Sequence, residues 1–163
     1  MGSEIFGIHT AQGLVESYQN KYWQCQDPKE AQIIFLGLDA NWDENIETND
    51  IYEEILRYLD DGVIYWKTNG YHHPFLLPDY KKGGGYRFHA NFVKTHITSQ
   101  YADNISFIEL LSIPTHGRST QVPDEFDKLI DVNYLRNLND IIFDNRPKIV
   151  FLVMCLFLCI HIF

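Results

Sequence analysis

Two carboxylates follow apolar stretches of this 163-residue chain in a pattern that could bring them together. The run over residues 33–37 is apolar and ends in a glycine, and Asp39 comes two residues later. A second apolar run, over residues 105–111, is interrupted by a single charged residue, Glu109. Because an unpaired carboxylate inside an apolar strand is costly, Glu109 must be hydrogen-bonded, protonated or placed in a cleft.

Both carboxylates lie near the carboxyl end of their apolar run, where α/β proteins usually bind ligands. If the two runs are adjacent parallel strands, Asp39 and Glu109 reach the same rim of a sheet, which predicts a site there. The residues alone leave two alternatives open. Asp39 and Asn41 could do no more than form a turn, as Asx residues often do. Glu109 could lie on a strand at the sheet margin and face solvent.

A long loop, predicted over residues 71–85, carries further candidate binding groups. The segment Lys81-Lys82-Gly83-Gly84-Gly85-Tyr86-Arg87 combines flexibility, positive charge and an aromatic ring, which suits contact with phosphates and stacking on a base. It is no P-loop, because the Gly-Lys-Ser/Thr ending is absent. Farther along, His116 beside Arg118 is a candidate anion contact. For both segments, an exposed surface loop without function is the alternative.

Metal ligation receives little support from the residue spacing. The segment Asp39-x-Asn41-x-Asp43-x-Asn45 resembles the start of a calcium loop, but Glu44 stands at position six and Asp50 at position twelve. The adjacent pair His72-His73 points in two directions, and no helical His-x-x-x-His supports it. We therefore expect no metal and no cofactor.

Composition bounds the class of protein. The length is that of one domain, and 11 Phe, 10 Tyr and 3 Trp allow a substantial core. A formal net charge of −9 argues against a polyanion-binding surface over the whole molecule, although a local basic loop remains compatible with it. Cys25, Cys155 and Cys159 follow no zinc spacing or disulfide framework, and residues 1–10 lack the features of a signal peptide. These features predict an intracellular, cytoplasmic protein.

Alternating helices and strands must position the candidate groups. Apolar stripes predict helices over residues 10–24, 50–61, 87–98 and 123–138, and apolar runs predict buried strands over 33–37, over 105–111 and after Pro147. Asp50 and Glu53 have capping-box spacing, and residues 114–119 are expected to form a loop. The alternation predicts an α/β fold with three layers, α/β/α, around a short central parallel sheet.

Almost every residue from 149 to 163 is apolar. A membrane-spanning helix needs about 20 such residues, so we expect a third buried strand instead. The expected organisation is a single domain over residues 1–163 that stops before it is complete, with 149–163 as an apolar terminal strand or tail. The alternative is a membrane anchor flanked by Lys148.

Taken in order, these segments resemble the uracil-DNA glycosylase superfamily, nearest its mismatch-specific thymine/uracil branch. Gly37-Leu38-Asp39-Ala40-Asn41 is similar to the first motif of the family, a glycine followed two residues later by Asp or Asn. His73-Pro74-Phe75 and Gly84-Gly85-Tyr86-Arg87-Phe88-His89 resemble its His-Phe and Asn-Arg-Phe-Trp region. The segment from Phe107 to Thr115 resembles its second strand and the Arg-Pro-Thr loop that follows.

The resemblance implies an enzyme that hydrolyses the N-glycosidic bond of a damaged or deaminated base, uracil or a related one, flipped out of DNA. Asp39 would hold or activate the hydrolytic water, Phe75 would stack on the base and Glu109 would touch the base edge. The substrate pocket would be completed by residues of the first motif: Gly37, Leu38 and Asn41. DNA phosphates would be bound by basic side chains: Lys81, Lys82, Arg87, His116 and Arg118.

Two features depart from the family pattern. Glu109 stands where classical members have a pyrimidine-reading Asn, and the final loop of the family, which follows the third strand, is not found before Phe163. The expected fold is therefore glycosylase-like with its C-terminal part missing. Two other functions remain open: a non-catalytic nucleotide- or base-binding module of the same fold, and the membrane-tethered protein described above.

Overall fold

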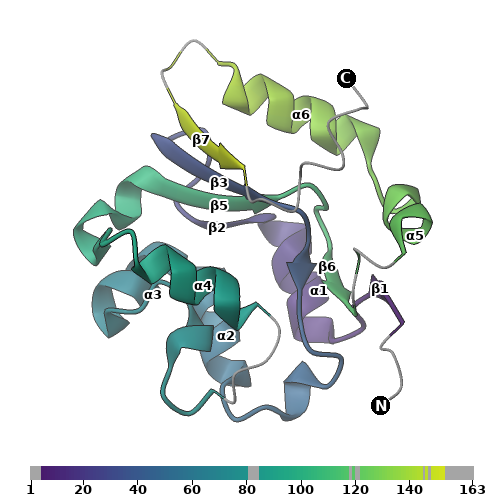
Figure 1. Cartoon of the computed structure of the whole chain (residues 1–163), viewed down its shortest axis with the longest axis horizontal. Helices are drawn as coiled ribbons and strands as arrows, with labels where there is room; N and C mark the ends of the chain where they lie inside the picture. The colour runs from purple at the N-terminus through teal and green to yellow at the C-terminus, as the bar shows by residue number, and fades with distance from the viewer. Residues whose placement is uncertain are drawn as a thin grey trace.

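The computed structural model describes residues 5–80, 85–117, 119, 122–144, 146 and 148–152. Its central sheet has four strands in the order β2 (Trp23–Cys25), β5 (Ile105–Glu109), β3 (Ile33–Gly37) and β7 (Ile149–Leu152) (Figure 1). Strand β3 runs parallel to both β5 and β7, as predicted, whereas β2 is antiparallel to β5. The fold is α/β, but the prediction of a purely parallel sheet is wrong.

The antiparallel strand arises in a segment that was predicted to be helical. Helix α1 (Gln12–Asn20) ends early, and the chain is already extended at Lys21, with φ −151° and ψ 107°. The backbone of β2 then pairs with β5, with Gln24 opposite Phe107. Pairing along this sheet edge satisfies backbone groups that a longer helix would have satisfied internally.

Alternate residues of the inner strands face two different helical layers. Ile34, Leu36 and Ile108 cluster with Tyr134 and Leu138 of α6 (Val132–Ile142). The intervening side chains cluster with apolar residues of three helices on the other face: α2 (Tyr52–Asp60), α3 (Gly62–Asn69) and α4 (Tyr86–Val93). The sheet is thus covered on both faces (Figure 1), as expected for strands that are apolar on both sides.

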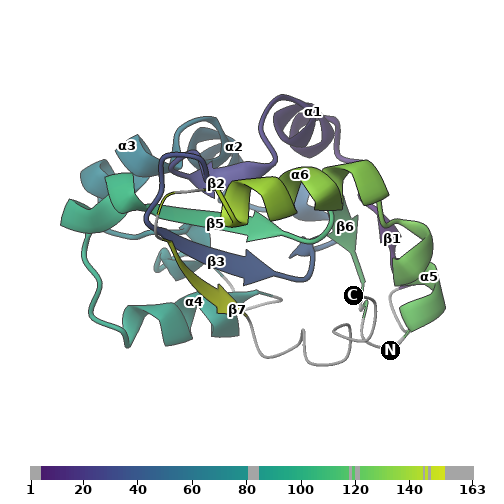
Figure 2. The ribbon, with the colours of Figure 1, turned by 90° about the horizontal axis from the view of Figure 1, so that it is seen from above.

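A second, small sheet lies beside the first and was missed by the sequence analysis. Its strands are β1 (Gly7–Ile8), β6 (Pro114–His116) and β4 (Ala40–Asn41), in the order β1-β6-β4. Figure 2 labels β1 and β6 of this sheet. Residues 114–116, predicted as loop, form its central strand because Thr115 pairs with Ile8 on one side and Asn41 on the other. This pairing brings the segment after β5 next to the segment after β3.

Several helix boundaries differ from prediction because Asp side chains cap different turns. The predicted capping box is absent: α2 has Ile51 as its N-cap, without a side-chain cap. Asp61 closes α2 as predicted, since its N–H donates to the Arg57 carbonyl oxygen, and its side chain also accepts a hydrogen bond from the Ile64 N–H and so starts α3. Likewise, Asp131 caps α6 and divides the predicted helix 123–138 into α5 (Pro123–Lys128) and α6. Short 3-10 turns occupy Ile46–Thr48, Pro74–Leu76 and Ser99–Asn104.

The helix predicted over 87–98 and the strand predicted over 105–111 both end earlier in the structure than predicted. The helix predicted over 87–98 ends at Val93, and His96 has a positive φ of 60°, which a continuing helix does not allow. The strand predicted over 105–111 ends at Glu109, so that this carboxylate stands at the carboxyl end of β5.

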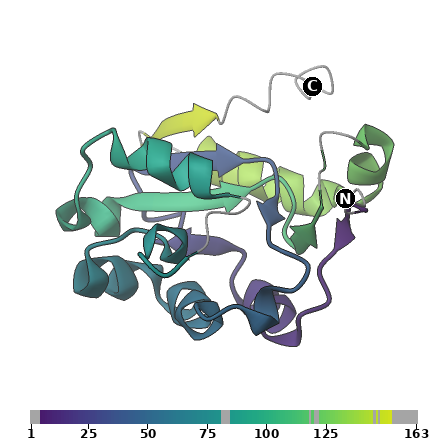
Figure 3. The same ribbon diagram turned by 60° about the horizontal axis from the view of Figure 1, so that its bottom comes forward.

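Strand β7 confirms a third parallel strand after Pro147, but it forms one edge of the sheet (Figure 3) and is not buried as predicted. Ile149, Phe151 and Leu152 are 57%, 48% and 48% exposed. Residues 153–163, the rest of the predicted tail, lie outside the described residues. In the part of the chain that the structure covers, no helix has the length and apolar character needed to cross a membrane.

Candidate functional site

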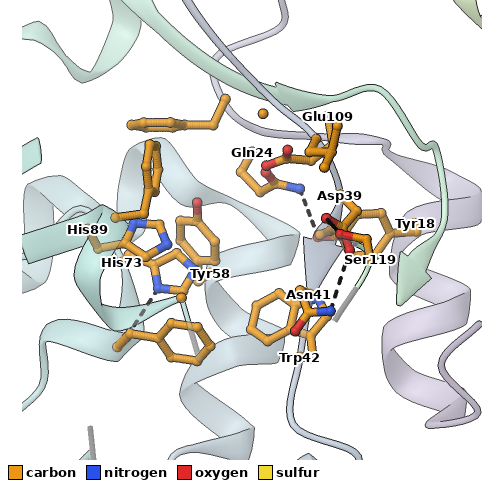
Figure 4. A pocket seen from close by; sticks show the side chains of 17 residues that line it. Tyr18, Gln24, Asp39, Asn41, Trp42, Tyr58, His73, His89, Glu109 and Ser119 are labelled. Carbon is orange, nitrogen blue, oxygen red and sulfur yellow. Dashed lines mark hydrogen bonds between the residues drawn. The ribbon is translucent and has the colours of Figure 1, made fainter. Parts of the chain in front are cut away.

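A cavity of about 220 Å³ lies at the carboxyl ends of β3 and β5 (Figure 4). Six residues predicted to bind or act on a substrate line it together: Gly37, Leu38, Asp39, Asn41, Phe75 and Glu109. The parallel pairing of β3 and β5 explains this convergence, since both strands end at the same rim. Asp39 and Glu109 lie on one side of the cavity, and His73 and His89 lie on the other (Figure 4).

Asp39 is held by three side-chain donors. Its Oδ2 accepts hydrogen bonds from Thr115 Oγ1 at 2.7 Å and from Asn41 Nδ2 at 3.4 Å, and its Oδ1 accepts one from Ser119 Oγ at 3.0 Å. Asn41 is itself oriented, because Nδ2 also donates to the Gly117 carbonyl oxygen at 2.6 Å. These donors hold the Asp39 side chain in one orientation. Asp39 is therefore a fixed negative charge on the wall of the cavity.

Thr115 and Ser119 were not among the predicted site residues. No spacing rule linked them to Asp39, because they follow it by 76 and 80 positions. The sequence feature that could have indicated these two residues is the short polar segment after β5. In the structure, part of this segment forms β6, which pairs with β4 in the small sheet.

The carboxyl group of Glu109 lies against the Cα of Gly37, on the side where a Cβ would be. The two residues are register partners in the β3–β5 pair, and a Cβ at position 37 would come within 2.6 Å of the Glu109 Cδ. The backbone carbonyl of Glu109 accepts a hydrogen bond from Tyr134 Oη at 2.7 Å, which anchors the end of β5. Although the residue keeps some surface open to the cavity, burial of its carboxyl group raises the pKa well above the ordinary value, and the nearby Asp39 charge raises it further.

The contact between Gly37 and Glu109 leads to a testable coupling. A Gly37→Ala substitution should lower the free energy of unfolding by about 0.5–1.5 kcal/mol, because the new methyl group forces the end of the Glu109 side chain to shift. In a Glu109→Ala background the same substitution should cost much less. Chemical denaturation of the four proteins in this double-mutant cycle measures the coupling. Equal losses in the two backgrounds would show that the contact is unimportant.

Aromatic rings form much of the remaining wall. Phe75 is 3% exposed and stacks on Tyr80, with ring centroids 4.5 Å apart and planes 9° apart. Trp42 meets Phe75 edge-on, at 5.3 Å. Tyr80 covers one face of the Phe75 ring, and the backbone of Gly85 also lies close to this ring, since a Cβ at Gly85 would come within 2.7 Å of Phe75 Cε2. Stacking of Phe75 on a base therefore stays a prediction.

Three histidines lie against this aromatic wall: His72 and His73 are buried, and His89 is partly buried. His73 and His89 stack with centroids 3.6 Å apart, and His72 Nε2 lies 3.0 Å from His89 Nδ1. Burial lowers the pKa of His72 to about 3, and it lowers the pKa values of His73 and His89 well below the ordinary range. His73 Nδ1 accepts the Phe75 backbone N–H at 3.1 Å, which requires an unprotonated nitrogen. The cluster is thus uncharged at neutral pH.

Within the described ranges, no group of three or more His, Cys, Asp or Glu side chains has the arrangement of a metal site. The adjacent histidines of the sequence instead belong to the packing of the cavity wall. His73 lines the cavity, while His72 packs between Trp66 and Phe107.

The predicted phosphate-binding residues are not gathered around the cavity. Arg87 is exposed on the first turn of α4, and His116 packs edge-on against His9 with centroids 5.9 Å apart, away from the cavity lining. Lys81, Lys82 and Arg118 lie outside the described residues. Among the described residues that line the cavity, there are two acids and no Lys or Arg.

Comparisons of this chain with protein-family models, with curated proteins and with solved structures found no match. The chemistry of the cavity therefore has to be inferred from its own residues. It offers one ionised carboxylate held by hydroxyl groups, one acid with a raised pKa, and aromatic and neutral imidazole rings.

Proposed function

We propose that the cavity receives a single nucleobase extruded from DNA and that Asp39 promotes hydrolysis of its N-glycosidic bond. The observation that supports this most strongly is the fixed Asp39 carboxylate on the wall of a small aromatic cavity, across from the ring cluster and beside Glu109. A cavity of about 220 Å³ is smaller than the sites that usually bind drug-sized molecules, and a single base suits it better. The proposed fold is correspondingly glycosylase-like.

The proposed reaction assigns Asp39 two tasks. As the C1′–N bond breaks, its electron pair leaves with the base and the sugar gains the character of an oxocarbenium cation. The fixed carboxylate stabilises that cation electrostatically. A water molecule bonds to C1′ through its oxygen and gives a proton to Asp39. The departed base anion takes up a proton from solvent and Asp39 releases its own to solvent, which leaves a free base, an abasic sugar and the carboxylate restored.

The direct test is base release. The protein is incubated with oligonucleotides that contain one uracil, one hypoxanthine or one mismatched thymine, as single strands and as duplexes, and free base and abasic sites are quantified. We expect release from at least one of these substrates and none from the unmodified, matched control. Absence of release from all of them would contradict the enzymatic proposal.

A second function has support from the charge of the molecule. The net charge is −9, and the described lining of the cavity has no basic side chain. Affinity for DNA comes largely from neutralised phosphates, so these features favour a module that binds a free base or nucleotide without catalysis. Binding of free bases together with no base release from DNA would identify this second function.

A further inference from the structure

We propose that Glu109 acts as an uncharged carboxylic acid and reads a base edge that presents an N–H group beside a carbonyl oxygen. This inference rests on the proposed function of the cavity as a base-binding site. It adds the chemical class of the base and the residue that selects it.

The two acids at the rim differ in their hydrogen-bond partners. Asp39 accepts from two hydroxyl groups and one amide, which compensates a negative charge. The Glu109 carboxyl group accepts no hydrogen bond from any described residue, although it lines the same cavity. Since two neighbouring carboxyl groups do not easily share a low-dielectric site as ions, the proton resides on Glu109, which has no donor among the described residues.

The groups around Glu109 also favour the neutral form. Those that interact with its charge are Asp39 after β3, Tyr18 of α1, Tyr58 of α2 and Tyr134 of α6. None of these groups, all in the described part of the chain, is a cation. Burial is the largest cause of the raised Glu109 pKa, and the charge of Asp39 is the second.

The space for the Glu109 carboxyl group comes from the register between β3 and β5. Gly37 lies beneath it without a side chain, which leaves room for the carboxyl group at this register position. On the neighbouring strand β2, the buried Gln24 lines the same cavity and donates from Nε2 to Tyr18 Oη at 3.1 Å. The Gln24 amide on this side of the cavity is therefore held in place before a ligand binds.

A neutral carboxylic acid donates through its O–H and accepts through its carbonyl oxygen, whereas a carboxylate only accepts. The neutral form complements the N3–H and O4 of uracil or the N1–H and O6 of hypoxanthine. A carboxylate would instead complement the N1–H and exocyclic amino group of guanine. The protonation state of Glu109 thus determines which class of base the cavity prefers.

Titration of free bases tests the inference without requiring catalysis. Uracil, 3-methyluracil and guanine are titrated into the wild-type protein, Glu109→Gln and Glu109→Ala, with binding followed by NMR. Because Gln retains one donor and one acceptor, we expect Glu109→Gln to bind uracil within about threefold of wild type and Glu109→Ala to lose about tenfold or more. 3-Methyluracil, which lacks the N3–H, should bind weakly to all three proteins.

The pH dependence supplies a second readout. Uracil affinity of the wild type should fall as the pH rises through the raised pKa of Glu109, because the ionised acid cannot donate to the base carbonyl. The uracil affinity of Glu109→Gln should stay constant over the same pH range. This variant is the control for ionisation of uracil itself, which would lower the affinity of both proteins. A carbon-13 NMR titration of the Glu109 carboxyl carbon in the wild type reports its protonation state directly and needs no folded variant.

Three results would each overturn the inference. The carbon-13 titration could show that the Glu109 carboxyl group is ionised at pH 7. Glu109→Gln could bind uracil as weakly as Glu109→Ala, or the wild type could bind guanine more tightly than uracil. These outcomes are separable from the fate of the proposed function. Uracil binding that follows the expected pattern without base release from DNA would reject catalysis alone. Base release by the wild type together with loss of uracil binding in Glu109→Gln would reject this inference alone.

Discussion

Replacing Asp39 by Asn should lower the rate of base release by about 100- to 1,000-fold while leaving base binding largely intact. The substitution removes the negative charge that stabilises the sugar cation and the group that accepts the proton of the attacking water. It keeps the shape of the side chain, and the hydroxyl groups of Thr115 and Ser119 can rotate to pair with an amide. Single-turnover base release and free-base titration measure the two properties separately.

Asp43→Asn is the matched control for this prediction. It removes the same charge from the same segment, but Asp43 is exposed and does not line the cavity. We expect its rate of base release to stay within about twofold of wild type, as for a screened surface charge. Equal effects of the two substitutions would mean that only net charge matters. An unchanged rate in Asp39→Asn would remove Asp39 from the reaction.

Acidification should unfold this protein cooperatively, with His72, His73 and His89 as a major cause. Each has a lowered pKa in the folded state, so the unfolded chain binds protons more readily below the ordinary pKa of 6.5. Stability from these groups is complete above pH 6.5 and is lost as the pH falls toward and through their folded pKa values, about 3 for His72. At 1.36 kcal/mol for each pKa unit, His72 alone corresponds to roughly 5 kcal/mol when the loss is complete.

Glu109 acts in the opposite direction. Its raised pKa means that the folded state binds the proton more tightly, so its contribution is present below the ordinary value of 4.5 and is lost as the pH rises. Because three imidazoles oppose one carboxyl group, we expect the net stability to fall on the acid side.

A His72→Phe variant should show a shallower loss of stability between pH 6.5 and 4, because one titrating group is removed from an apolar site beside Trp66 and Phe92. His96→Asn is the control, since His96 is exposed and its positive φ of 60° is tolerated by Asn. Urea denaturation at several pH values measures the slopes. The slope is compared rather than the stability at one pH, because His72→Phe also removes the partner of His89. Identical slopes for wild type and His72→Phe would show that protonation of His72 does not contribute to the loss of stability in acid.

Local patterns in the sequence were sufficient for the inner strands of the sheet and for the rim position of the two acids. The apolar runs predicted over 33–37 and 105–111 contain the inner strands β3 and β5, because a strand covered on both faces is apolar throughout, and the run from 149 begins with the edge strand β7. Glu109 was conspicuous for the same reason, as the one charge in such a run. Asp39 needed only the rule that ligands bind beyond the carboxyl ends of parallel strands.

The tertiary structure alone decided the partners of those acids and the electrostatic difference between them. Thr115 and Ser119 reach Asp39 because β6 pairs with β4 across more than 70 positions of sequence, and backbone pairing at that separation leaves no periodic signal. The placement of Glu109 over Gly37 depends on the β3–β5 register, and its burial depends on side chains from separate helices. A sequence determines which residues are acids, whereas the desolvation and the donors that set their charge come from chain segments brought together only by folding.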